Sequence, residues 1–184
     1  MQNFQEFLEN SLQQNIKKLV PLTGGASADI NRIILENNNE LIVRRSLSKE
    51  QSVMAVPKKL EAKIQRIVRS NDAPVPEIIF EFSEDEDIGE GYVMEAIPGE
   101  TIPRKILRDD KYKNVRSKLS FEIGRSLATI HQTKLDELTD LDSVTFEESL
   151  KKLYLVYSSF EQPQPVFELA FKWLETQELT KYDN

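Results

Sequence analysis

The chain has no cysteine and only one histidine, His131, among its 184 residues. The lack of cysteine excludes disulfides and thiolate metal ligands, and it fits a reducing compartment, so we expect a cytoplasmic protein. A single histidine excludes a metal site built from several imidazoles. No apolar run reaches the roughly 18 to 20 residues that a membrane-spanning helix needs. The first ten residues, MQNFQEFLEN, lack the basic start and apolar core of a secretory signal. We therefore expect no membrane partner.

Basic residues are also in deficit, with 24 lysines and arginines against 31 aspartates and glutamates, a net charge of −7. A nucleic-acid-binding protein needs a basic face, so we expect no nucleic-acid partner. Much of the acidic charge lies in EFSEDEDIGEG, residues 81–91. This run is interpreted as a solvated turn, because it lacks the ligand spacing of a calcium-binding loop.

Glycine is scarce as well, and the only adjacent pair among the six glycines is Gly24-Gly25, within LVPLTGGASADI. Its neighbourhood allows two interpretations: a loop whose backbone N–H groups hold a phosphate, or a plain flexible turn. Rossmann and P-loop sites place their glycines between a strand and a helix. Here both flanking runs are typical of strands. A glycine loop in a hairpin above the phosphates is the arrangement of protein kinases.

The hydrophobic pattern predicts an α+β fold that divides near Pro98. Before that residue we expect a five-stranded antiparallel sheet with one inserted helix over residues 57–70. A further helix starts the chain, and strands are expected within residues 15–23, 29–46 (two strands with a turn), 78–82 and 90–97. After it only helices are expected, over residues 114–132, 145–159 and 165–177, the second opened by a capping box.

A kinase-like arrangement also needs a cation on the third strand and an acid on the following helix. The run ELIVRRS offers Arg44 or Arg45, and strand alternation sends one of them to each face of the sheet. Glu61 lies on the helix, beside its apolar stripe. The fifth strand runs into YVMEAIPG, in the place where a kinase linker meets the adenine edge.

These segments in order, LTGGASADINRI, LIVRRS, EAKIQRIV, APVPEIIF, GYVMEAIPGETI and IGRSLATIH, resemble the aminoglycoside phosphotransferase family. They are most similar to the branch related to acyl-CoA-dehydrogenase-associated kinases. The resemblance covers residues 19–131, the N-terminal portion of such a kinase. It implies a protein-kinase-like fold, with a nucleotide-binding small lobe over residues 1–97 and the hinge exit with an incomplete helical large lobe over residues 98–184.

The resemblance also implies a set of ATP-binding residues. Arg44 would contact the α- and β-phosphates, and Glu61 would orient it through a charge-assisted pair. Glu95 and Ile97 would offer backbone hydrogen bonds to adenine. The full implied set consists of the glycine loop Gly24, Gly25, Ala26 and Ser27, the pair Arg44 and Glu61, and the adenine-pocket residues Met94, Glu95, Ala96 and Ile97.

One part of the family pattern is missing from the sequence. The catalytic HGDxxxxN loop and the later metal-binding aspartate are absent, and His131, in LATIHQT, matches the end of a helix instead. We therefore assign no catalytic or metal-binding residue in this chain. Mg²⁺ is expected as the counter-ion of ATP, with its protein ligands beyond residue 184. As given, the chain is expected to have little or no phosphotransferase activity.

The predicted function is thus the ATP-binding portion of a small-molecule kinase that transfers the γ-phosphate to a substrate hydroxyl. The acceptor stays open among an antibiotic, a sugar, a choline-like alcohol and a hydroxyacyl thioester. The alternative is a non-catalytic kinase-like module that binds a partner. The apolar helices of the incomplete large lobe, above all the one with Trp173, are expected to lack a covering layer, so a genuine short form should form an oligomer or be poorly soluble.

Overall fold

The structure, a computed structural model, describes residues 4–22, 29–47, 56–83, 88–134, 136 and 144–177. The chain forms two compact units, residues 1–138 and 139–184. This division does not test where a nucleotide-binding lobe ends, so the boundary expected at residue 98 stays a prediction. No helix within the described ranges is long and apolar enough to cross a membrane.

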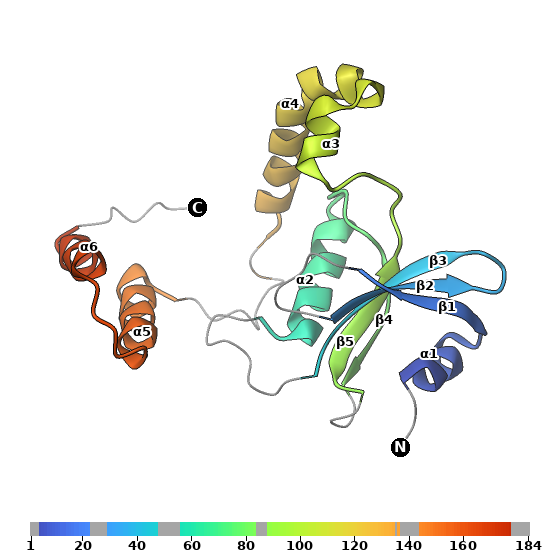
Figure 1. The fold of residues 1–184 in the computed structure, drawn as a ribbon, viewed down its shortest axis with the longest axis horizontal. Coiled ribbons are helices and arrows are strands. Elements are labelled where there is room, and N and C mark those ends of the chain that lie inside the picture. The colour runs from blue at the N-terminus through green and yellow to red at the C-terminus, as the bar shows by residue number, and fades with distance from the viewer. Residues whose placement is uncertain are drawn as a thin grey trace. The chain divides into compact units, whose positions relative to one another are not determined.

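The first unit is built on the five-stranded antiparallel sheet that the sequence predicts, in the order β1-β2-β3-β5-β4 (Figure 1). The strands are β1 (Ile16–Pro21), β2 (Asp29–Leu35), β3 (Glu40–Ser46), β4 (Ile78–Ser83) and β5 (Glu90–Glu95). The central strand β3 pairs with β2 on one side and β5 on the other. The fold class, α+β with a sheet followed by helices, is therefore confirmed.

Four α-helices complete the first unit: α1 (Phe4–Leu12), α2 (Lys58–Ser70), α3 (Pro103–Arg108) and α4 (Lys113–His131), with a 3₁₀ turn at Asp110–Tyr112. The sequence pattern missed α3 and the 3₁₀ turn, because such short elements hold too few residues to show a period. The strands expected within residues 15–23 and 90–97 are confirmed, with β1 over Ile16–Pro21 and β5 over Glu90–Glu95.

One face of the sheet packs against α1. Leu8 of this helix is fully buried, and so are Ile33, Val43 and Val93 from the three strands β2, β3 and β5. Burying one such side chain stabilises a fold by about 1.5–3 kcal/mol. This cluster is the larger of the two cores in the described part of the unit, and it fixes which side of each strand faces α1.

The opposite face packs against α2, which lies beside β4 and β5 (Figure 1). Ala62 of α2, Ile78 and Tyr92 are buried there, with Met94 packed against them. A bulge between Ile78 and Phe80 shifts the register of β4. Because of this bulge, Ile78 joins the α2 face, although Phe80 and Phe82, two and four residues after it, belong to the cluster on the α1 side.

The helix expected over residues 114–132 is present as α4, but its apolar side chains are not buried. Val115, Ile123 and Leu127 are 47%, 52% and 48% exposed. None of the residues of α4 is buried by another described element. His131 ends the helix, as expected, and is exposed.

The second unit contains α5 (Phe146–Ser159) and α6 (Pro165–Glu175). The predicted capping box opens α5, with the Glu148 N–H donating to Thr145 Oγ1 at 3.2 Å and the Thr145 N–H to the Glu148 carboxylate at 2.9 Å. The two helices meet through an aromatic contact in which the Tyr154 and Phe171 ring centroids lie 5.0 Å apart. Phe171 is the one buried side chain of α6, while Trp173 is 61% exposed.

Candidate functional site

The two neighbouring arginines of β3 point to opposite faces of the sheet. Arg45 lies on the α1 side, where its Nε donates to Asp29 Oδ2 at 2.7 Å and its guanidinium sits 3.6 Å from the centroid of the Phe4 ring. Arg44 lies on the α2 side, where its Nε donates to Glu61 Oε2 at 3.0 Å. The structure thus brings Glu61 together with Arg44 and separates it from Arg45, because a strand turns successive side chains to alternate faces.

The Glu61 carboxylate is the centre of a larger network. The Tyr92 hydroxyl donates to Oε2, the oxygen that Arg44 also uses, at 3.2 Å. Lys58 Nζ donates to the other oxygen, Oε1, at 2.7 Å. The Lys58 side chain is only 6% exposed. Two cations therefore surround one carboxylate, and the cluster carries one unit of net positive charge.

Burial and neighbouring charges shift the pKa of three groups in this cluster, Glu61, Arg44 and Tyr92. Burial alone would raise the pKa of Glu61, but the hydrogen bonds and charges of Arg44 and Lys58 outweigh it and lower that pKa. Burial alone would likewise lower the pKa of Arg44, and the Glu61 carboxylate reverses this and raises it. Burial first, and then the Glu61 charge, raise the pKa of Tyr92 to about 12. At neutral pH the cluster holds a carboxylate, two cations and a neutral phenol.

The hydrogen bond between Arg44 and Glu61 uses only one nitrogen of the guanidinium, Nε. Its Nε is the nitrogen that bonds Glu61, and no described residue hydrogen-bonds to either of the terminal amino groups, Nη1 and Nη2. These two groups form the planar fork with which arginine binds carboxylates and phosphates. Arg44 is thus fixed at one edge and has a free donor pair at its tip.

A cleft of about 790 Å³ opens beside this cluster. Its charged and polar lining comes from β3, β5 and α2, and its apolar lining from α2, the segment before β4, and the end of α4. The lining residues are Arg44, Val56, Lys58, Glu61, Ile64, Gln65, Val68, Val75, Pro76, Tyr92, Met94 and Ile130. A mostly apolar hollow with a few convergent polar groups is the usual form of a small-molecule site.

Strand register shows which further side chains share this face. Arg44 pairs across the sheet with Ile30 of β2 and with Tyr92 of β5. Ile42, two residues before Arg44 on the same strand, pairs with Met94. Directly paired residues lie on one face, so Ile30, Ile42 and Met94 share the face of Arg44, together with Arg32, the partner of Ile42 on β2.

The predicted adenine-pocket residues divide into two groups. Met94 lines the cleft, and Gln65 Nε2 lies 3.8 Å from its sulfur. Glu95, Ala96 and Ile97 follow it along the chain but do not line this cleft. The backbone N–H of Glu95 already donates to the Glu77 carbonyl at 2.9 Å, whereas that of Ile97 makes no hydrogen bond to any described residue.

The glycine-loop residues Gly24, Gly25, Ala26 and Ser27 lie outside the described residues. On either side of them β1 and β2 pair as an antiparallel hairpin, and the Leu22 N–H donates to the Ile30 carbonyl at 2.9 Å. The loop thus joins two adjacent strands, as the sequence predicts.

Lys58 and Tyr92 are members of the cluster that the sequence did not single out. Lys58 stands three residues before Glu61, a spacing that places two side chains on the same side of a helix. Tyr92 is a core residue with 4% exposure. Its hydroxyl has a polar role that only the approach of α2 to the sheet reveals.

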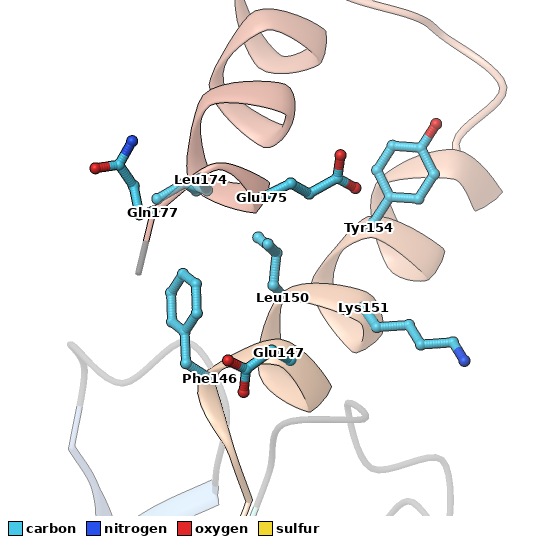
Figure 2. A pocket seen from close by; sticks show the side chains of 8 residues that line it. All are labelled: Phe146, Glu147, Leu150, Lys151, Tyr154, Leu174, Glu175 and Gln177. Atoms are coloured by element: carbon cyan, nitrogen blue, oxygen red, sulfur yellow. The ribbon is translucent and has the colours of Figure 1, made fainter. Parts of the chain in front are cut away.

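A second, smaller cavity of about 320 Å³ lies in the other unit. Figure 2 shows side chains of α5 and α6 facing it, among them Phe146, Leu150 and Leu174. Glu147, Lys151 and Glu175 also line it, and none of the predicted site residues does. The cleft at Arg44 therefore remains the candidate site.

No group of three His, Cys, Asp or Glu side chains among the described residues is placed to hold a metal ion.

Comparison with known proteins gives a match at the level of the family. No curated protein matches the chain. The model of the phosphotransferase enzyme family matches residues 18–179, a span that includes the sheet except for the first two residues of β1, the Arg44–Glu61 pair and the helices from α2 to α6. The chain therefore belongs to the phosphotransferase enzyme family.

Proposed function

We propose that this chain carries the ATP-binding portion of a small-molecule kinase, which transfers the γ-phosphate of ATP to a substrate hydroxyl. Membership of the phosphotransferase family supports phosphoryl transfer as the reaction. The observation that carries ATP binding is Arg44, held through Nε by Glu61 with both terminal amino groups unused by the described residues.

The charge of the cluster suits a polyphosphate. Arg44 and Lys58 together outweigh Glu61 by one positive charge, in a chain whose net charge is −7. An anion is therefore attracted to this point of an otherwise acidic protein. A planar guanidinium fork matches two oxygens of one phosphate, and such charge-assisted bonds are about twice as strong as neutral ones.

The adjoining surface suits a purine ring. Ile30, Ile42 and Met94 lie on the same face as Arg44 and offer an apolar wall to one side of the base. Of the predicted backbone donors, the N–H of Glu95 is engaged by Glu77, and that of Ile97 is not engaged by any described residue. The proposal therefore assigns the donor for the adenine edge to Ile97.

When bound with the nucleotide, Mg²⁺ neutralises charge on the phosphates. The described residues offer no metal cluster, so the proposal assigns no metal ligand to them. What the described residues do is bind and orient: Arg44 fixes the phosphates, Glu61 fixes Arg44, and the apolar wall fixes the base. The lack of cysteine supports a cytoplasmic setting for this function.

Nucleotide binding by the 184-residue chain tests the proposal. Calorimetric titration with MgATP and with adenosine is compared between the natural chain and Arg44→Ala. We expect saturable MgATP binding that Arg44→Ala weakens at least tenfold, as the loss of a charge-assisted contact of about 1.5–3 kcal/mol requires. Adenosine binding should be unchanged by the substitution. Absence of MgATP binding, or equal affinity in both proteins, would contradict the proposal.

A second candidate function, a non-catalytic kinase-like module that associates through its helices, draws on the exposure of α6. Val166, Leu169 and Trp173 are 76%, 70% and 61% exposed, so the helix presents a large apolar surface. Light scattering at increasing concentration tests association, with Trp173→Glu as the matched variant. This candidate predicts oligomers that the variant reduces, whether or not MgATP binds. A monomer at every concentration would count against it.

A further inference from the structure

Glu61 accepts hydrogen bonds from three side chains, and only one of them, Arg44, belongs to the kinase-like pair that the sequence predicts. We propose that Lys58 and Tyr92 are positioning residues of the nucleotide site. They fix the Glu61 carboxylate so that it holds Arg44 by Nε alone and leaves the terminal amino groups of Arg44 free for phosphate. This inference rests on the proposed function, and it adds two residues that act through Glu61.

Arg44 and Lys58 use different oxygens of the Glu61 carboxylate. An arginine and a carboxylate left to themselves favour a double contact, with two parallel N–H···O bonds to the two oxygens. Here Lys58 Nζ lies 2.7 Å from Oε1, while Arg44 Nε lies 3.0 Å from Oε2. A second bond from Arg44 to Oε1 would have to compete there with the Lys58 ammonium, and Arg44 bonds Oε2 alone. The Lys58 contact thus favours the single Nε bond over the double contact.

Lys58 is a buried lysine, unlike most lysines of protein surfaces. Its side chain is 6% exposed, and besides Glu61 its ammonium approaches the Val56 carbonyl at 3.5 Å. A buried ammonium is stable only while it is paired, so this contact is a fixed part of the site. Because Lys58 and Glu61 are three residues apart on α2, their side chains meet on one side of this helix, and the contact forms within the helix itself.

Tyr92 binds the same carboxylate from the sheet. It is the direct cross-strand partner of Arg44 on β5, and its hydroxyl donates at 3.2 Å to the oxygen that Arg44 uses. Tyr92 therefore ties Oε2 to the sheet, as Lys58 ties Oε1 to the helix. Burial and the Glu61 charge raise the pKa of this phenol to about 12, so it remains a donor at neutral pH.

Nucleotide affinity tests the inference through a double-mutant cycle. Lys58→Met should lower MgATP affinity about tenfold, since Arg44 can then turn its fork to Glu61, and should leave adenosine affinity unchanged. In the Arg44→Ala background the same change should have a much smaller effect, limited to the loss of the Lys58 charge near the phosphates, because a positioning residue acts through its target. Lys58→Arg should restore part of the affinity. Lys59→Met, the neighbouring exposed lysine, is the matched control and should change nothing.

Tyr92→Phe is the milder second variant, because it removes one hydroxyl and keeps the ring that packs in the core. We expect a fall in MgATP affinity of about threefold, again only while Arg44 is present. An equal loss in the natural and Arg44→Ala backgrounds would overturn the positioning role, and so would unchanged MgATP affinity in both Lys58→Met and Tyr92→Phe.

A nucleotide-free measurement separates this inference from the proposed function. In the natural chain, the NMR signals of the Arg44 side chain should show a slowly exchanging Nε–H and freely rotating terminal amino groups. In Lys58→Met one terminal amino group should become hindered as the double contact to Glu61 forms. Identical spectra in the two proteins would overturn the inference even if MgATP binds. A failure of MgATP binding with the expected spectral change would overturn the proposed function alone.

Discussion

Replacing Arg44 by lysine keeps the positive charge on β3 and removes the property on which the proposed site depends. The arginine bonds Glu61 through Nε at 3.0 Å and retains two terminal amino groups that no described residue engages. A lysine ends in one ammonium, which must serve Glu61 and phosphate with the same nitrogen. The substitution therefore keeps the positive charge at position 44 and removes the pair of terminal donors.

The expected size follows from the bonds at stake. One charge-assisted hydrogen bond contributes about 1.5–3 kcal/mol, and 1.4 kcal/mol corresponds to a factor of ten, so MgATP affinity should fall about 10- to 100-fold. Protein stability should change by less than about 1 kcal/mol, because the side chains of Arg44 and Glu61 are 26% and 24% exposed and lysine keeps an ion pair with Glu61.

The assay is calorimetric titration of MgATP and adenosine, with urea denaturation of the same proteins. Arg45→Lys is the matched control, because Arg45 is the adjacent residue on the same strand and faces α1 instead of the cleft. It should leave MgATP affinity unchanged and lower stability. If Arg45→Lys reduced MgATP affinity more than Arg44→Lys, or if Arg44→Lys bound MgATP normally, the assignment of Arg44 would be refuted.

Three further outcomes follow from the same structure. Glu61→Gln should lower the melting temperature at neutral pH, because two cations lose their carboxylate. As the pKa of Glu61 is lowered in the folded state, its stabilisation is present above the ordinary value of 4.5 and lost as pH falls through the lower folded pKa, so the difference in melting temperature should close in acid. Tyr92 has a raised pKa, so its stabilisation is present below pH 10 and lost as pH rises through about 12. Ultraviolet titration of tyrosinate should show a component at about 12 that Tyr92→Phe removes. If the variant retained that component, it would belong to another tyrosine. Gly91→Ala should destabilise the chain by about 1–3 kcal/mol in urea, since a Cβ there would lie 2.5 Å from the Arg44 carbonyl oxygen and 2.6 Å from the Phe82 ring. Gly124→Ala on α4, where a Cβ meets nothing within 4 Å, is the control and should be neutral or slightly stabilising. Equal stability of the two alanine variants would show that the space at Gly91 can relax.

The sequence by itself determined the five strands, the longer helices and the family. The alternation of apolar residues along Asp29–Leu35 and Glu40–Ser46 is a local property of each strand, so the pattern alone predicts both strands and the turn between them. Similarly, Thr145 and Glu148 predict the start of α5, because a capping box involves residues only three apart. The resemblance carried by the ordered motifs agrees with the family match over residues 18–179.

Only the tertiary structure decided which groups meet. Strand alternation by itself left Arg44 and Arg45 equivalent, since it predicts opposite faces without saying which face α2 covers, and only the family resemblance named Arg44. Packing of α2 on the face of Ala62 and Tyr92 settled the choice, because it placed Glu61 within 3.0 Å of Arg44. The same packing brought the Tyr92 hydroxyl to the carboxylate, whereas Lys58 reaches it from within α2 itself. The hydrogen bonds of Arg44 and Tyr92 to Glu61 join residues from different elements, and such distances depend on how helix and sheet dock, which no local pattern of residues encodes.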